Sequence, residues 1–397
     1  MPLRLALVSL HTSPNDDPGT GDVGGMNVAV RHTALALAAL GHHVDVLTRR
    51  SSPSVPDAVE IAPRVTLRQL HAGPAERRVK GDHEEYIAEF GDAMRHLGPY
   101  DVIHSHHWFS GMAALELAQH HGIPHVQSFH SIAAASATPL SEGERPESPG
   151  RLAGEELLAQ RSDAIITVSD AERSTVTDRL GADPARVMTV PPGVDADQFS
   201  PKTTPDAATG DAGYLLAAAR LEPLKGLDLA IDALAELPKQ GRPDLIVSGG
   251  ATTGFDDYPS ELRALAKRRG VADRVHFIGP QSRDALADLL RGARIALVPS
   301  HSETFGLIAL EAQSCATPVV ASDAGGLREA VVDGQTGVLV PVREPSAWAG
   351  AISTLLRDPE RCAQLGAAGR ERAQRFTWER TAQGTVAVYE KLLGRRA

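Results

Sequence analysis

Short apolar runs alternate with longer amphipathic stretches along this chain, and that alternation restricts its fold more than any other feature. The runs at residues 3–10, 43–48 and 65–70 have the length and composition of buried strands. The stretch at 26–40, which is followed by Gly41, has the pattern of a helix. Strands that alternate with helices form parallel sheets covered by helices. The sequence therefore predicts an α/β protein.

The alternation occurs in two series, which predicts two domains. Further strands of the first series are expected at 102–104, 125–129, 164–168 and 187–190. A polar segment rich in Pro, Thr, Ala and Asp follows at 200–211 and is the best linker. The second series starts with a strand at 214–219. We place the domains at 1–198 and 199–378, because 397 residues suit two cores of about 150–200 residues each.

The composition excludes several classes of protein. Apolar residues make up 42 % of the chain, and no apolar run approaches the roughly 18 residues that span a bilayer. The net charge of −10 argues against nucleic acid or an anionic membrane as a partner. Two cysteines cannot form a disulfide framework, and residues 3–10 fit a first strand better than a signal peptide. We therefore expect a cytoplasmic protein without a membrane span.

The most informative motif follows the expected strand at 295–298. Glu303 and Glu311 are eight positions apart, just over two helical turns, so both carboxylates can share one side if Glu303 sits at the mouth of the helix. Backbone N–H groups at such a helix start bind anions. The sequence predicts that this segment holds the diphosphate and the hydroxyls of a nucleotide sugar through Glu303, Thr304, Phe305, Gly306, Leu307 and Glu311. Alternatively, both glutamates are ordinary helix residues.

A second motif, Arg220-x4-Lys225-Gly226, follows the first strand of the second series. An Arg and a Lys on such a loop can both bind one diphosphate. Cleavage of a glycosyl–diphosphate bond places negative charge on the leaving group, and fixed cations stabilise that transition state. The two motifs together predict a donor site in the second domain that needs no metal and no other cofactor.

Taken together, these motifs resemble those of the retaining glycosyltransferases of family 4. The resemblance includes Thr317-Pro318-Val319-Val320-Ala321 and the pair Gly325-Gly326. It implies the B-type fold, with two facing Rossmann-like domains and a C-terminal helix, residues 379–397, that crosses back to the first domain. It also implies that Arg220, Lys225 and Glu303 act in catalysis.

The first half narrows the resemblance to the D-inositol 3-phosphate glycosyltransferases of mycothiol biosynthesis. The segments are Gly24-Gly25-Met26-Asn27-Val28 and His104-Ser105-His106. This resemblance implies UDP-N-acetylglucosamine as the donor, with Gly25 near its phosphate. It places the acceptor against Asn27, and the acceptor's phosphate against Lys80, Ser131 and Arg151.

The chain departs from this subfamily close to the expected acceptor site. His107, which we also predict to contact the acceptor, stands where a Tyr is expected, and Ser131 where a Thr is expected. Lys80 is one of six lysines and lies in a local basic patch, and Arg151 follows a Pro-rich segment. The alternative is that both cations are solvated surface residues. A second hypothesis therefore stays open. It is a natural-product glycosyltransferase that takes another nucleotide sugar, including a GDP-sugar, as donor and an aminocyclitol or a small thiol as acceptor.

His130 follows the expected strand at 125–129, at a sheet edge that would carry ligands. Its imidazole or its backbone carbonyl could contact the donor sugar near the reacting carbon, a role that the family resemblance favours. The alternative is a histidine that caps a helix. We predict His130 as a catalytic residue.

Three other motifs are weaker. Gly19-x-Gly21-x-x-Gly24 matches a dinucleotide fingerprint but lies eight residues after the strand, which disfavours an NAD-dependent dehydrogenase. His104, His106 and His107 lack a neighbouring Cys or carboxylate at ligand spacing, so we expect hydrogen-bonded histidines and no metal. Asp195-Ala196-Asp197 lies in a turn and is interpreted as structural. A sugar-nucleotide-binding module without activity and a homodimer stay open as hypotheses.

Overall fold

A computed structural model of the chain describes residues 1–16, 19, 22–201 and 213–394. These residues form two compact units. Unit 1 comprises Met1–Asp16, Gly25–Gly193 and the last helix, whereas unit 2 comprises Val194–Thr377 with Gly19 and residues 22–24. Most of the expected linker at 200–211, and Gly21 of the dinucleotide-like fingerprint, lie outside the described residues.

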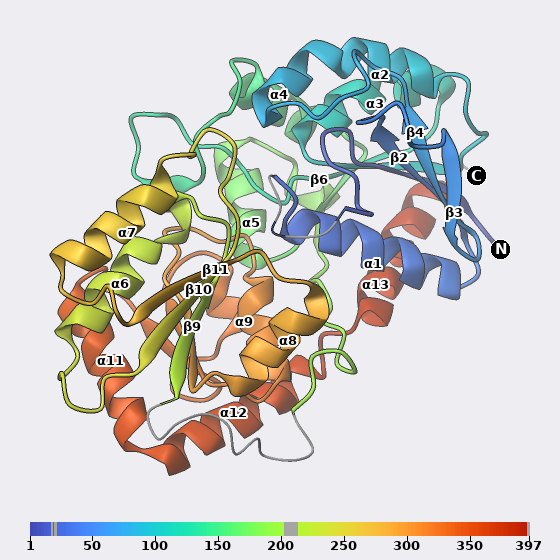
Figure 1. Ribbon diagram of the computed structural model, residues 1–397. Coiled ribbons are helices and arrows are strands. Elements are labelled where there is room, and N and C mark those ends of the chain that lie inside the picture. The colour runs from blue at the N-terminus through green and yellow to red at the C-terminus, as the bar shows by residue number, and fades with distance from the viewer. Residues whose placement is uncertain (17–18, 20–21, 202–212, 395–397) are drawn as a thin grey trace. The chain divides into compact units, whose positions relative to one another are not determined.

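Unit 1 is built on an eight-stranded sheet with the order β3-β4-β2-β1-β5-β6-β7-β8, of which Figure 1 labels β2, β3, β4 and β6. Neighbouring strands pair in parallel, except that β3 runs antiparallel to β4 at the edge. The strands are β1 (Arg4–Val8), β2 (His43–Arg49), β3 (Ala58–Ala62), β4 (Val65–Leu70), β5 (Val102–His106), β6 (His125–Ser128), β7 (Ala164–Thr167) and β8 (Val187–Thr189).

Helices cover both faces of this sheet, so its central strands are buried on both sides. On β1, Ala6 and Val8 join the core under α2 and α3, whereas Leu5 and Leu7 join the core under α1 and α13. The helices of unit 1 are α1 (Gly25–Ala39), α2 (Ile87–Met94), α3 (Trp108–His121), α4 (Arg151–Arg161), α5 (Asp170–Ser174) and α13 (Trp378–Gly394).

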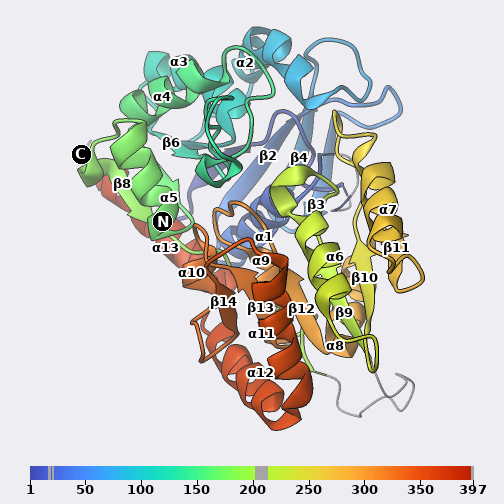
Figure 2. The same ribbon diagram turned by 90° about the vertical axis from the view of Figure 1, so that its left-hand side faces the viewer.

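Unit 2 is built on a six-stranded, all-parallel sheet with the order β11-β10-β9-β12-β13-β14 (Figure 2). Its strands are β9 (Tyr214–Ala218), β10 (Asp244–Ser248), β11 (Val275–Gly279), β12 (Ile295–Val298), β13 (Val319–Ser322) and β14 (Val338–Val340). Its helices are α6 (Leu227–Glu236), α7 (Tyr258–Arg268), α8 (Arg283–Gly292), α9 (Leu307–Ser314), α10 (Leu327–Ala330), α11 (Pro345–Arg357) and α12 (Pro359–Ala373).

The last helix, α13, belongs to unit 1 although its sequence follows unit 2. It packs against α1, where the rings of Trp378 and His32 stack with their centroids 5.0 Å apart. The hydroxyl of Thr381 donates to the carbonyl of Pro191 at 2.9 Å. The crossing-back helix expected from the sequence is therefore confirmed.

The structure confirms the α/β class and the two parallel sheets. The sequence interpretation missed β3, whose residues are half-exposed or exposed and lack the apolar pattern of a buried strand. In the part of the chain that the structure describes, no helix is long and apolar enough to cross a membrane.

Candidate active site

The candidate donor site lies where the strand order of unit 2 reverses. Strand β9 lies between β10 and β12, so the loops after β9 and β12 diverge at this point. Such a switch point at the carboxyl ends of parallel strands is the usual ligand site of a doubly wound sheet. The first loop carries Arg220 and Lys225, and the second carries Glu303.

Lys225 and Glu303 form an ion pair in unit 2. Lys225 Nζ lies 2.9 Å from Glu303 Oε1, and the Ser300 hydroxyl donates to the same oxygen at 2.8 Å. Both charged side chains are about 15 % exposed, so a ligand can still reach them. The structure thus brings together two residues that the sequence placed 78 positions apart.

Hydrogen bonds to backbone carbonyls hold these two loops in place. His301 N donates to the carbonyl of Leu224 at 2.8 Å, and Arg343 Nη1 donates to the carbonyl of Pro299 at 2.6 Å. Gly226 has a left-handed φ of 63°, and a Cβ there would lie 2.1 Å from Pro299 O. Only glycine fits this position without moving the loop.

Glu303 and Glu311 do not share a helix face. The helix α9 begins at Leu307 after Gly306, whose φ is 102°, so Glu303 lies in the preceding loop with Thr304 and the buried Phe305. The prediction that the two carboxylates share one side of a helix is therefore wrong. Backbone geometry decides it, because the left-handed Gly306 ends the loop and starts the helix.

Glu311 is held by a residue that the sequence interpretation missed. Arg283, at the start of α8, places Nη2 2.7 Å from Glu311 Oε1. The Arg283 guanidinium also lies over the Phe199 ring, 4.5 Å from its centroid. No spacing rule connects positions 199, 283 and 311, so only the tertiary structure could reveal this contact.

In the loop after β9, Arg220 Nη2 lies 3.0 Å from Glu222 Oε1.

In unit 1, Lys80, Ser131 and Arg151 converge on Glu144. Lys80 Nζ lies 3.1 Å from Glu144 Oε1, and the Ser131 hydroxyl donates to the same oxygen at 2.9 Å. Arg151 pairs with Glu144 as well, and its Nη2 donates to Ser131 Oγ at 3.0 Å. The three residues expected to bind the acceptor phosphate thus form one cluster.

Arg151 is completely buried, so the alternative that it is a surface residue is wrong. Besides Glu144, it pairs with Glu147 and, at 2.7 Å, with Glu155. Trp108 Nε1 also donates to Glu147, at 2.7 Å. A buried guanidinium is tolerated only when its donors are paired, and these carboxylates satisfy it.

His107 brings a different chemistry to the same cluster. It is 2 % exposed, and neither ring nitrogen has a hydrogen-bond partner among the described residues. Its Nε2 lies 3.9 Å from Glu147 Oε1, and with Glu144 these side chains could offer three ligand atoms to a cation. The expectation that no carboxylate accompanies this histidine is therefore wrong. Lys80 and Arg151 already bond to both carboxylates, which disfavours a cation there.

His130 lies two residues beyond the end of β6, with a left-handed φ of 61°. Its Nε2 bonds to His106 Nδ1 at 2.8 Å, and burial lowers the pKa of His130 to about 4. No helix begins directly after it, so the helix-capping alternative is wrong.

On α1, Asn27 is buried and donates to the carbonyl of Ser13 at 3.0 Å, and Gly25 is the exposed first residue of that helix.

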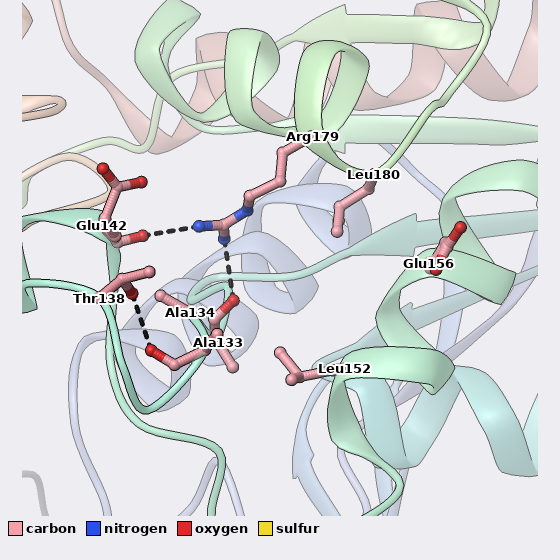
Figure 3. A pocket seen from close by; sticks show the side chains of 9 residues that line it. Ala133, Ala134, Thr138, Glu142, Leu152, Glu156, Arg179 and Leu180 are labelled. Atoms are coloured by element: carbon pink, nitrogen blue, oxygen red, sulfur yellow. Dashed lines mark hydrogen bonds between the residues drawn. The ribbon is translucent and has the colours of Figure 1, made fainter.

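Behind the loop that carries Ser131 lies a pocket of about 250 Å³. Figure 3 shows Arg179 reaching the carbonyls of Glu142 and Ala133, to which it donates at 2.8 and 2.9 Å. The apolar side of the pocket is formed by Leu152 and Leu180. Arg179 therefore joins Ala133 to Glu142 through their backbone carbonyls.

The turn at 195–197 has a structural role, as expected. Asp195 Oδ1 accepts hydrogen bonds from the backbone N–H of Asp197 at 3.1 Å and of Gln198 at 3.0 Å. This carboxylate stabilises its own turn.

Family models match both halves of the chain. Residues 24–193 match a "Glycosyl transferase 4-like domain", and residues 204–372 match "Glycosyl transferases group 1". Curated relatives extend the match to nearly full length. The chain is 42 % identical to a D-inositol 3-phosphate glycosyltransferase of Kineococcus radiotolerans, over 99 % of this chain and 96 % of that protein. It is also 42 % identical to a D-inositol 3-phosphate glycosyltransferase 2 of Catenulispora acidiphila, over 98 % and 95 %.

Solved structures agree with the fold. A sucrose-phosphate synthase from Thermosynechococcus elongatus is similar with a TM-score of 0.89 and 31 % identity, over 99 % of this chain and all of that chain. Anabaena HepE in complex with UDP and glucose is similar with a TM-score of 0.77 at 21 % identity, over 98 % and 100 %, which bears on the fold alone. The chain therefore belongs to the family 4 glycosyltransferases of B-type fold, the nucleotide-sugar-dependent family that includes the D-inositol 3-phosphate glycosyltransferases.

Proposed function

We propose that this glycosyltransferase transfers N-acetylglucosamine from UDP-N-acetylglucosamine to a small hydroxylated acceptor such as inositol 3-phosphate, with retention of anomeric configuration. The observation that carries the proposal is the convergence of Lys80, Ser131 and Arg151 on one cluster in unit 1. The names of the curated relatives support the same acceptor.

The proposed donor chemistry follows from the charges in unit 2. When the bond between C1 of the sugar and the diphosphate oxygen breaks, negative charge grows on the leaving group. Arg220 and Lys225 would bind that charge, and Lys225 would exchange part of its contact with Glu303 for the phosphate. Glu311, held by Arg283, would accept hydrogen bonds from the ribose hydroxyls.

Retention is proposed from family membership. The acceptor oxygen would attack C1 on the face from which the diphosphate leaves, and the acceptor proton would pass to the departing phosphate oxygen. This route requires no side chain as a covalent nucleophile and no metal ion. An anomeric proton coupling that shows an inverted product in the proton NMR spectrum would refute retention. Loss of transfer in EDTA would refute the metal-free mechanism.

A second acceptor class is favoured by one specific observation. Lys80 and Arg151 are matched by three carboxylates, those of Glu144, Glu147 and Glu155. A phosphate would have to draw the cations away from these partners, whereas an aminocyclitol could use the carboxylates directly. A related transferase for an amine-bearing acceptor is therefore the second candidate.

A donor-by-acceptor panel read by mass spectrometry tests the proposal. UDP- and GDP-sugars would be combined with inositol 3-phosphate, free inositol, an aminocyclitol and a small thiol. We expect product only from UDP-N-acetylglucosamine with inositol 3-phosphate. If free inositol were used as well as inositol 3-phosphate, the proposed phosphate pocket would be refuted. A preference for the aminocyclitol would instead support the second candidate function.

A further inference from the structure

The buried His106 and the half-buried His130 meet at the carboxyl edge of the unit 1 sheet. His106 is the last residue of β5, and His130 follows β6. His106 Nδ1 lies 2.8 Å from His130 Nε2, and the ring planes are tilted by 33°. His130 is predicted from the sequence to be a catalytic residue, whereas His106 has no role in that prediction or in the proposed function.

The protons of this pair can be assigned from the surroundings of His106. His106 is 3 % exposed, and its Nε2 has no hydrogen-bond partner among the described residues. If that nitrogen carried the proton, a buried N–H would be left unpaired, which is rarer in native proteins than an unpaired acceptor. The proton of His106 therefore lies on Nδ1 and is donated to His130 Nε2. His130 must then carry its own proton on Nδ1.

Neither ring takes up a second proton near neutral pH. Burial lowers the pKa of His130 to about 4 and that of His106 well below its ordinary value. The hydrogen bond thus joins two neutral rings with fixed tautomers.

We propose that His106 is a positioning residue that holds His130 in the Nδ1–H tautomer and in one orientation. His130 then presents a hydrogen-bond donor and cannot act as a base through Nε2. The inference rests on the proposed sugar transfer and on the contact between His130 and the donor sugar that is predicted from the sequence. It agrees with a reaction in which the leaving phosphate takes the acceptor proton. His130 needs such support because its left-handed backbone conformation is strained for a residue with a Cβ.

His104, two residues earlier on β5, provides a matched control. The Ser128 hydroxyl donates to the carbonyl of Ile166 at 2.9 Å, so His104 Nε2 must donate to Ser128, at 3.0 Å. His104 Nδ1 therefore accepts the Tyr389 hydroxyl at 2.7 Å. Both nitrogens of His104 are satisfied, and its contacts join β5 to β6 and α13.

The test uses the full-length protein and two substitutions of one residue. His106→Asn keeps an N–H group near the position of Nδ1, whereas His106→Gln places its amide near the position of Nε2. We expect kcat to fall about tenfold in His106→Gln and to stay within about threefold in His106→Asn. The Kd of UDP should be unchanged in both variants, because the proposed nucleotide contacts lie in unit 2. His104→Asn should lower the urea midpoint of unfolding and leave kcat within about threefold.

A spectroscopic readout is independent of turnover. Nitrogen-15 NMR of histidine-labelled protein distinguishes the two neutral tautomers, and loss of a signal in His130→Gln assigns His130. We expect the Nδ1–H form in the wild type and in His106→Asn, and a mixture in His106→Gln. An Nε2–H form of His130 in the wild type would overturn the proposal. A changed tautomer with unchanged kcat would overturn the positioning role. Failure of the acceptor panel alone would overturn the proposed function and leave the tautomer result standing.

Discussion

Each cation of the two candidate subsites rests against a carboxylate of its own unit. Lys225 contacts Glu303, Arg220 contacts Glu222, and the Lys80–Arg151 cluster contains three glutamates. Paired charges are held in place before a ligand arrives, which lowers the cost of ordering them on binding. Ligand phosphates would then compete with carboxylates that are already present.

Lys225→Ala tests the role of the donor-site cation. We expect kcat to fall by about 10²-fold with little change in the donor KM, since the charge on the leaving group develops in the transition state. Steady-state kinetics against donor concentration would measure both. Lys267→Ala, at an exposed position of α7, is the matched control and should leave both constants unchanged. If the donor KM rose about 10²-fold and kcat stayed normal, Lys225 would instead contribute to ground-state binding of the donor.

Glu311 and Arg283 should act on donor affinity. Glu311→Ala should raise the donor KM and the Kd of UDP about tenfold, because the hydrogen bonds proposed with the ribose would be lost. Arg283→Met should have a smaller effect in the same direction, since it leaves Glu311 without the contact that orients it. Isothermal titration with UDP measures both variants, and Glu360→Ala on α12 serves as the control. Wild-type affinity in Glu311→Ala would exclude this assignment.

At the scale of elements, close backbone approaches fix the loop that carries Glu303. Gly326 N donates to the carbonyl of Glu303 at 2.9 Å. A Cβ on Gly326 would lie 2.1 Å from Thr304 O and 2.7 Å from Phe305 Cα, so no side chain fits without displacing the loop. The glycine pair after β13 is thus required by packing against the loop after β12.

Gly326→Ala should therefore damage both stability and activity. We expect a loss of about 1–3 kcal/mol in the free energy of unfolding, as for other overpacked sites, and a raised donor KM. Gly350→Ala is the control, because it lies on α11 with nothing within 4 Å of the added Cβ. That variant should be neutral or gain up to about 1 kcal/mol from helix propensity. Urea unfolding and donor kinetics compare the two.

For the molecule as a whole, the buried histidines of unit 1 link its stability to pH. Burial lowers the pKa of His83 and His130 to about 4 and that of His125 to about 3. In the unfolded chain these imidazoles titrate near 6.5, so below that pH the unfolded state binds more protons. Their contribution to stability is complete above pH 6.5 and is lost as the pH falls toward 4. Each such histidine costs about 1.4 kcal/mol per pH unit within that window.

Urea unfolding at pH 7.5 and pH 5 would measure this linkage. A Trp348→Phe background leaves Trp108 and Trp378, both in unit 1, as the fluorescent reporters. We expect the free energy of unfolding to be markedly lower at pH 5. In His125→Asn, unfolding should take up about one proton fewer, so this free energy should depend less steeply on pH. His121→Gln, at an exposed position, is the control and should match the parent. Equal pH dependence in His125→Asn and the parent would contradict the assignment.

The sequence by itself determined the α/β class, the two series of strands and the family. Periodicity and local motifs carry that information, because a buried parallel strand must be apolar throughout and a loop after it is free to hold polar groups. The placement of Arg220, Lys225 and Glu303 in loops after strands of unit 2 followed from the same rules. Whether these residues bind the donor as proposed stays a prediction.

Only the tertiary structure decided which charges meet. The contacts of Glu311 with Arg283, of Arg151 with Glu144, and of His106 with His130 join different elements. Parallel strands place their carboxyl ends at one edge, but the strand order that makes two ends neighbours is absent from local pattern. The edge strand β3 was missed because an edge needs little apolar surface. The local sequence therefore indicates which residues lie at strand ends, and the packing of the elements decides which of them come into contact.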